Sequence, residues 1–144
     1  MDPSIERARE QDAGDIFRLL EGHRLPIDGL LDHLATALVA RHDGRIVGSA
    51  ALEVYPDGAL LRSVAVTPEL QHHGLGRSLI DAAIRMARDL GVPAVYLLTT
   101  TAERYFPRFG FSRIERPEVP ATVRASVEFT SACPSSAVVM RKRL

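Results

Sequence analysis

The chain has 144 residues, of which 46% are hydrophobic and 25% are charged, a balance typical of a globular protein with its own core. Its 18 Lys and Arg residues match its 18 Asp and Glu residues, so no net charge favours binding to nucleic acid or to a membrane. A single cysteine, Cys133, excludes an intramolecular disulfide, and no membrane-spanning run or signal peptide is evident. We therefore expect one cytoplasmic domain over residues 1–144.

The first half of the chain alternates short strands with short helices. Ile16, Leu19 and Leu20 share one helical face, and Gly22 follows them as a stop signal. Turn residues at 42–44 and 56–58 predict tight connections between strands. The predicted elements in this half are a strand at 4–8, helices at 12–21 and 27–36, and strands at 37–41, 45–55 and 59–66.

The second half opens with the most regular helix of the sequence, which carries apolar residues on one face and charged residues on the other. Gly91 and Pro93 end this helix. The predicted elements are a helix at 75–90, a strand at 94–98, a short helix at 102–109, a strand at 111–115 and a last strand near 136–140. This alternation predicts an α/β protein, and no internal repeat or linker indicates a second domain.

The loop at 71–78, between the strand at 59–66 and the helix at 75–90, has the character of an anion site. Gly74 and Gly76 lack side chains, so a ligand can approach the backbone where the first turn of the helix presents free N–H groups. Arg77 adds a charged donor. The loop matches neither a P-loop nor a Rossmann fingerprint, because neither spacing of glycines is present. The remaining alternative is a plain turn into a helix.

The spacing Gln71-x-x-Gly74-x-Gly76 resembles the signature of the GNAT superfamily of acyl-CoA N-acyltransferases. The resemblance implies a GNAT fold of the α/β (α+β) class, whose mixed central sheet is splayed between its fourth and fifth strands and flanked by helices. It also implies acetyl-CoA as co-substrate, without a metal. Pantetheine would pair with the strand before the loop, and the pyrophosphate would meet the loop itself. The cofactor-binding residues would be Val64, Ala65, Val66, Gln71, His72, His73, Gly74, Leu75, Gly76, Arg77, Ser78 and Phe106.

A second GNAT motif resembles residues 99–111, where Ala102, Gly110 and Phe111 stand in register. Phe106 occupies the position of the tyrosine that is often proposed to protonate the leaving thiolate, and Leu60 that of a carboxylate found in some members. Tyr105 stands one residue early, which rotates it by about 100° on a helix. The substitute catalytic candidates are Glu53, Tyr105 and Cys133, whose alternative roles are a surface carboxylate, a packing residue and a small buried apolar residue.

The Thr-Thr-Thr-Ala-x-x-Tyr-Phe version of this motif is similar to amino-acid N-acetyltransferases, and more closely to the short arsenic-resistance-associated (ArsN-type) N-acetyltransferases. That resemblance implies acetylation of the amine of a small amino acid or analogue, in arsenic-related detoxification for the ArsN type. The substrate-binding candidates are Arg62, Ser63, Thr99, Arg104 and Arg124, with further hydroxyls at Thr100, Ser131 and Ser135. The alternatives are a protein N-terminal or lysine acetyltransferase and a non-catalytic acyl-CoA-binding module. Many relatives pair through C-terminal strands, so a homodimer is a further expectation.

Overall fold

The computed structural model describes the backbone of residues 3–144 and the side chains of that range other than Ser131 and Ala132. Within it the strands form a seven-stranded mixed sheet in the order β1-β2-β3-β4-β5-β7-β6. The strands are β1 Ser4–Arg7, β2 Ala37–His42, β3 Arg45–Tyr55, β4 Gly58–Val66, β5 Ala94–Thr99, β6 Ser112–Ile114 and β7 Val138–Arg143. The helices are α1 Ala13–Gly22, α2 Leu75–Asp89 and α3 Ala121–Arg124, with 3-10 turns η1 Glu10–Asp12, η2 Leu30–Thr36, η3 Pro68–Leu70, η4 Phe106–Phe109 and η5 Arg116–Glu118 and a π turn η6 Glu128–Ala132.

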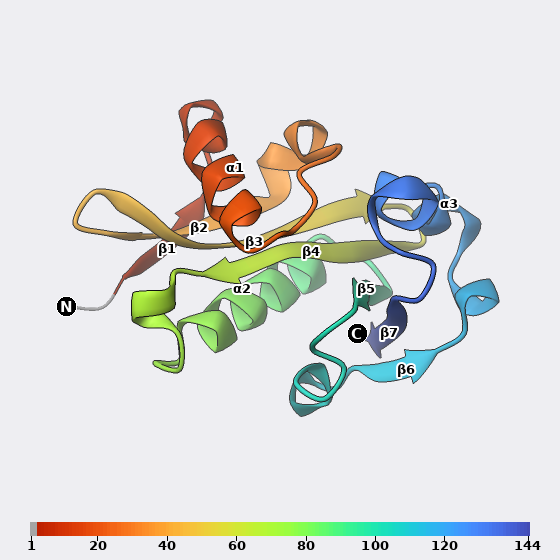
Figure 1. Ribbon diagram of the computed structural model, residues 1–144. Helices are drawn as coiled ribbons and strands as arrows, with labels where there is room; N and C mark the ends of the chain where they lie inside the picture. The colour runs from red at the N-terminus through yellow and green to blue at the C-terminus, as the bar shows by residue number, and fades with distance from the viewer. Residues whose placement is uncertain (1–2) are drawn as a thin grey trace.

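Helices cover both faces of the sheet, as Figure 1 shows, with α1 and η2 on one side and α2 on the other. The alternation of side chains along a strand supplies both cores. In β3, Ala50 and Leu52 pack with α2, whereas Ala51 between them packs with Ile16 and Leu20 of α1. No helix in residues 3–144 is long and apolar enough to span a membrane.

The strands β4 and β5 run parallel but stay paired only at their beginnings. Ala59 to Leu61 of β4 pair with Val95 to Leu97 of β5, and beyond these residues the two strands no longer pair with each other. The predicted mixed sheet, splayed between its fourth and fifth strands, is thereby confirmed. On the other side of β4, the register with β3 skips Ser63 and Val64, and Ser63 has a φ of 60°. This bulge lies where the splay begins, and bulges of this kind re-aim main-chain groups near active sites.

Three predicted elements differ from the structure in type or by two or more residues at one end. The helix predicted at 27–36 is only the 3-10 turn Leu30–Thr36, because Gly29 before it adopts a left-handed φ of 75°. The helix predicted at 102–109 is a turn followed by the 3-10 turn Phe106–Phe109, whose Pro107 lacks the N–H that an α-helix uses. The last strand starts later than predicted, at Val138, and continues to Arg143, since it pairs with both β5 and β6.

Candidate active site

The predicted anion site is a cavity of about 410 Å³ at the N-terminal end of α2. Gly74 is the N-cap residue of α2 with a φ of 86°, and no side chain caps the helix there. The free N–H groups of the first turn are therefore available to an anion. Its lining residues are Val66, Gln71, His72, Gly74, Gly76, Arg77, Tyr105 and Arg108.

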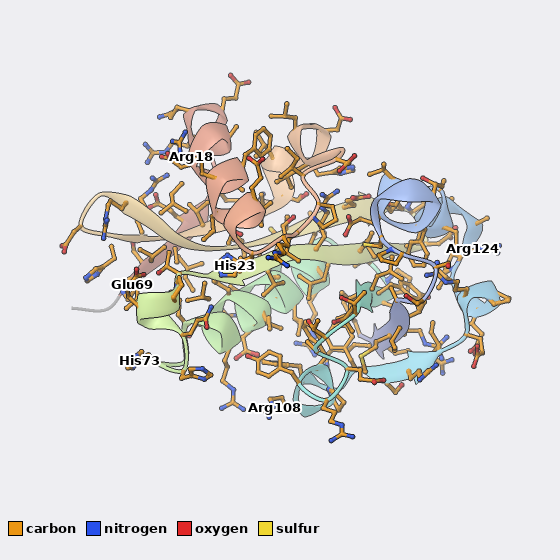
Figure 2. The ribbon with its side chains drawn as sticks, viewed as in Figure 1. Arg18, His23, Glu69, His73, Arg108 and Arg124 are labelled. Atoms are coloured by element: carbon orange, nitrogen blue, oxygen red, sulfur yellow. The ribbon has the colours of Figure 1, made fainter. Side chains whose placement is uncertain are left out.

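Two arginines give this cavity its positive charge. Arg77 comes from α2 itself and is exposed, and Arg108 comes from η4. Figure 2 labels Arg108 on the η4 turn and His73 on the loop before α2. Guanidinium groups beside a helix N-terminus form the arrangement that binds phosphate oxygens. Arg108 was not predicted, because only the folding of η4 brings it to this cavity.

The other loop residues divide between lining the cavity and supporting it. His72 lines the cavity, and its backbone has a left-handed φ of 67°. His73 is exposed and does not line the cavity. Leu75 packs in the core on α2. The Ser78 hydroxyl donates to the carbonyl of Gly74 at 3.1 Å, so it steadies the first turn.

Gln71 and His23 hold the end of β4. The Gln71 amide donates to the Val66 carbonyl at 3.0 Å, and His23 Nε2 lies 2.8 Å from the same oxygen. His23 Nδ1 lies 2.9 Å from the carbonyl of Leu19, which ties the end of α1 to this point (Figure 2). Gln71 of the signature therefore supports the strand on which pantetheine is expected. His23, which contacts the same carbonyl oxygen, was not predicted from the sequence.

A second cavity of about 540 Å³ occupies the splay between β4 and β5. Tyr105 lines both cavities, so the two lie side by side. The walls come from four stretches of the chain that are far apart in the sequence. They are Arg24 to Pro26, Leu61 to Val64, Leu97 to Phe106 without Glu103 and Arg104, and a last group of Glu128, Cys133, Pro134 and Ala137.

Both Tyr105 and Phe106 face the second cavity, since the chain there is a turn rather than a regular helix. The Tyr105 ring packs edge-on against Phe106 and Phe109, and the Arg108 guanidinium lies 4.8 Å from its centroid. The Thr99 hydroxyl accepts the N–H groups of Thr101 at 3.3 Å and Ala102 at 2.9 Å, which shapes this turn.

Arg62 is a buried structural cation with a 3% exposed fraction. Its guanidinium donates to Glu53 at 2.8 Å and to the carbonyls of Asp28 at 2.6 Å and Pro26 at 3.1 Å. Its Nε donates to the Ser63 hydroxyl at 3.2 Å. These bonds fasten the loop at 26–28 onto β4 beside the bulge and leave Arg62 little capacity for a substrate carboxylate.

Glu53 is the fully buried partner of Arg62 and lines neither cavity. Tyr55 donates its hydroxyl to Glu53 Oε1, and His33 Nε2 lies 3.7 Å from the same oxygen. Burial alone would raise the pKa of the Glu53 carboxyl, but hydrogen bonds from Ser126, Tyr55 and Arg62 hold that pKa below its usual range. Its position indicates a structural role.

The remaining predicted residues lie in different places. Cys133 lines the second cavity, where burial and the neighbouring Glu128 raise the pKa of its thiol to about 11. Arg104 and Arg124 are exposed and line neither cavity, and Figure 2 shows Arg124 near α3, well away from His73. Thr100 lines the second cavity, whereas the side chain of Ser131 lies outside the described residues.

Glu128 is the buried residue of this cavity that sequence reasoning missed. Its exposed fraction is 7%, and its Oε2 lies 3.8 Å from Arg62 Nη2 without a hydrogen-bond partner among the described groups. Burial raises the pKa of the Glu128 carboxyl, an effect that the charge of Arg62 opposes only in part. Among the described residues, no group of three or more His, Cys, Asp and Glu side chains is placed to hold a metal ion.

Comparison with known proteins decides the family. The model of the acetyltransferase (GNAT) family matches residues 5–111. The chain belongs to this family. An amino-acid acetyltransferase of Mycobacterium tuberculosis is 35% identical over 131 residues, which cover 84% of this chain and 75% of the relative. The predictions of a GNAT acetyltransferase fold and of acetyl-CoA as co-substrate are confirmed.

Two solved structures are similar over nearly the whole chain. Rv2747 from M. tuberculosis in complex with CoA superimposes with a TM-score of 0.83 at 29% identity, covering 99% of both chains. N-acetylglutamate synthase from Neisseria gonorrhoeae in complex with CoA and N-acetyl-glutamate gives a TM-score of 0.85 at 26% identity. That match covers 100% of this chain but only 35% of the synthase, so it concerns one part of a longer protein.

Proposed function

We propose that this acetyltransferase transfers the acetyl group of acetyl-CoA to the amine of a small amino acid or amino-acid analogue. The observation that carries the proposal is the pair of adjoining cavities that share Tyr105. The first, with its helix N-terminus and arginines, suits the pyrophosphate of CoA. The second, with the splayed strand and a bulge, suits the pantetheine arm and the acetyl group, whose carbonyl main-chain donors can polarise.

The size of the second cavity supports a small acceptor. Its volume of about 540 Å³ must hold the end of the pantetheine arm as well as the acceptor. The loop at 24–26 and the segment that contains Glu128 and Cys133 form its walls, so a protein chain has little room beside the thioester. The names of the M. tuberculosis and N. gonorrhoeae relatives, amino-acid acetyltransferase and N-acetylglutamate synthase, support the same acceptor class.

Arg24 gives the acceptor's carboxylate a partner. It lines the second cavity, is exposed, and makes no side-chain hydrogen bond or ion pair with the residues that the structure describes. Its φ of 56° is a strained conformation for a residue other than glycine, and such strain is often kept at functional sites. Because Arg62 is committed to its own network, Arg24 replaces it in our proposal as the carboxylate-binding cation.

Release of CoA thiol from acetyl-CoA, measured with each amino acid and with phosphinate and arsenic analogues in turn, tests this function. Amine-dependent release is the expected result, and the acceptor with the highest kcat/KM identifies the substrate. If no compound caused release of CoA thiol, and calorimetry on the same sample showed that acetyl-CoA binds, a peptide acceptor or a binding module would instead be favoured. The ArsN-type resemblance stays a prediction, which the arsenic analogues in the panel test.

A further inference from the structure

We propose that Glu128 binds the ammonium group of the acceptor and accepts the proton that this group must lose before it attacks the thioester. The inference rests on the proposed function, because it assigns the acceptor amine a place inside the second cavity. The sequence motifs leave both familiar acid and base positions apolar, with Leu60 and Phe106 there. A carboxylate from another part of the fold can therefore act as the general base.

The geometry of Glu128 distinguishes it from the other candidates. Glu128 is one of the residues that line the second cavity, and its buried Oε2 has no hydrogen-bond partner among the described residues, although the residue is more than nine-tenths buried. A carboxylate oxygen that is buried without a hydrogen bond costs stability, which a folded protein normally avoids. A ligand that supplies N–H donors would satisfy this oxygen.

The charges around Glu128 favour a cation. Arg62 faces two buried carboxylates, those of Glu53 and Glu128, so these three side chains carry one negative charge in excess when both carboxylates are ionised. Two further groups that act on the Glu128 carboxyl, the Cys133 thiol and the Asp28 carboxylate, add no positive charge. An ammonium group that enters the second cavity would balance the excess, whereas an anionic group would increase it.

Glu128 is also placed at the end of the cavity where transfer is expected. Its partner Arg62 lies directly after Leu61, the last residue of β4 that pairs with β5. The anion cavity adjoins the opposite end of β4, at Val66. A pantetheine arm that starts at the anion cavity and follows β4 therefore brings its thioester towards Arg62 and Glu128.

The proton and bond changes balance without any further reactant. The Glu128 carboxylate takes one proton from the acceptor ammonium, and the freed nitrogen lone pair forms a bond to the thioester carbonyl carbon. As the carbon–sulfur bond breaks, its electron pair leaves on sulfur, and the nitrogen's surplus proton passes to that sulfur to give the amide and the CoA thiol. Glu128 then returns its proton to water. A base that acts in this way typically contributes about 10²- to 10⁴-fold to the rate.

The test compares Glu128→Gln with the wild-type enzyme and with Glu10→Gln, an exposed control on η1. We expect Glu128→Gln to lower kcat/KM for the acceptor about 100-fold or more while its affinity for acetyl-CoA stays within about twofold. The wild type should lose kcat/KM as the pH falls through the raised pKa of Glu128, and this acidic limb should vanish in Glu128→Gln. Glu128→Asp should recover part of the activity and the acidic limb.

The outcomes separate the two proposals. A wild-type enzyme with acceptor-dependent turnover and a Glu128→Gln variant with the same kcat/KM and the same pH profile would overturn the role of Glu128 alone. A wild-type enzyme that binds acetyl-CoA but acetylates no amine would overturn the proposed function, and this inference with it. Calorimetry with acetyl-CoA and circular dichroism on each variant show that a lost rate is not a lost fold.

Discussion

The two adjoining cavities are built in different ways. The anion cavity is formed mainly by one continuous loop and the start of α2, where main-chain N–H groups and exposed arginines face solvent. The second cavity is formed by four stretches that are distant in the sequence and contains charged side chains that are almost wholly buried. Changes in the anion cavity should therefore affect ligand binding alone, whereas changes in the second cavity should affect the stability of the fold as well as activity.

The largest effect is expected from Arg62→Met. The variant removes the only cation that the structure places against both Glu53 and Glu128 among the described residues, so two buried carboxylates lose their partner. Breaking a buried ion pair of this kind costs about 3–5 kcal/mol of unfolding free energy. Urea denaturation measures it, with Arg124→Met as an exposed control expected within about 0.5 kcal/mol of the wild type. Equal midpoints for both variants would mean that the cluster does not stabilise the fold.

Gly76→Asp should break the anion cavity and leave the fold intact. A Cβ at Gly76 would lie 3.6 Å from the Tyr105 hydroxyl and 3.8 Å from Val66 Cγ2, which is ordinary contact. The added carboxylate, however, would face the pyrophosphate, and repulsion of a few kcal/mol corresponds to a loss of affinity for acetyl-CoA of about 100-fold or more. Calorimetry measures this, with Gly76→Ala as the control for added bulk. Unchanged affinity for acetyl-CoA in Gly76→Asp would show that the cofactor does not bind at this loop.

The two cavities should respond differently when one arginine is removed from each. Arg77→Ala should weaken acetyl-CoA binding by about fivefold to tenfold, because it loses one charge-assisted hydrogen bond at an exposed site, and salt should reduce the difference. Arg24→Ala should raise the acceptor KM by a similar factor and leave acetyl-CoA binding unchanged. Steady-state kinetics and calorimetry measure the two effects. If Arg24→Ala changed only the affinity for acetyl-CoA, the acceptor carboxylate would have to bind elsewhere.

The smallest expected effect is a gain in stability for Glu128→Gln, the variant that is expected to lose activity. The folded pKa of Glu128 lies above its unfolded value, so its charged form costs stability once the pH has risen through that folded pKa. Glu128→Gln should therefore be more stable than the wild type near pH 8, by about 0.5–1 kcal/mol, as is common for functional groups held in unfavourable places. Thermal melting at pH 4 and pH 8 tests this, and a gain that is largest at pH 4 would contradict it.

Glu53 should show the reverse pH dependence. Its folded pKa lies below its unfolded value, so its contribution to stability is present above the unfolded pKa and is lost as the pH falls through the folded pKa. The same Arg62 guanidinium therefore faces one carboxylate that stabilises the fold and one that is left available to a ligand. The hydrogen bonds that each receives, and not their residue type, make this difference.

The family, the chain order of the main strands and the glycine loop before α2 could all be predicted from the sequence. The loop could be predicted because Gly74, Gly76 and the helix after them are neighbours in the chain, so their geometry follows from local backbone conformation.

The partners of the charged residues in the second cavity could not be predicted from the sequence, because they are set by the tertiary fold. Arg62 donates hydrogen bonds to residues 9 and 34 positions away, and Glu128 reaches it from the far end of the chain. Neither the full set of hydrogen bonds on Arg62 nor the oxygen of Glu128 that lacks one therefore follows from local sequence. Likewise, Tyr105 faces both cavities because Pro107 and Gly110 prevent a regular helix. The chemical role of a side chain depends on burial and on its partners, and both are set by contacts between segments that meet only in the folded protein.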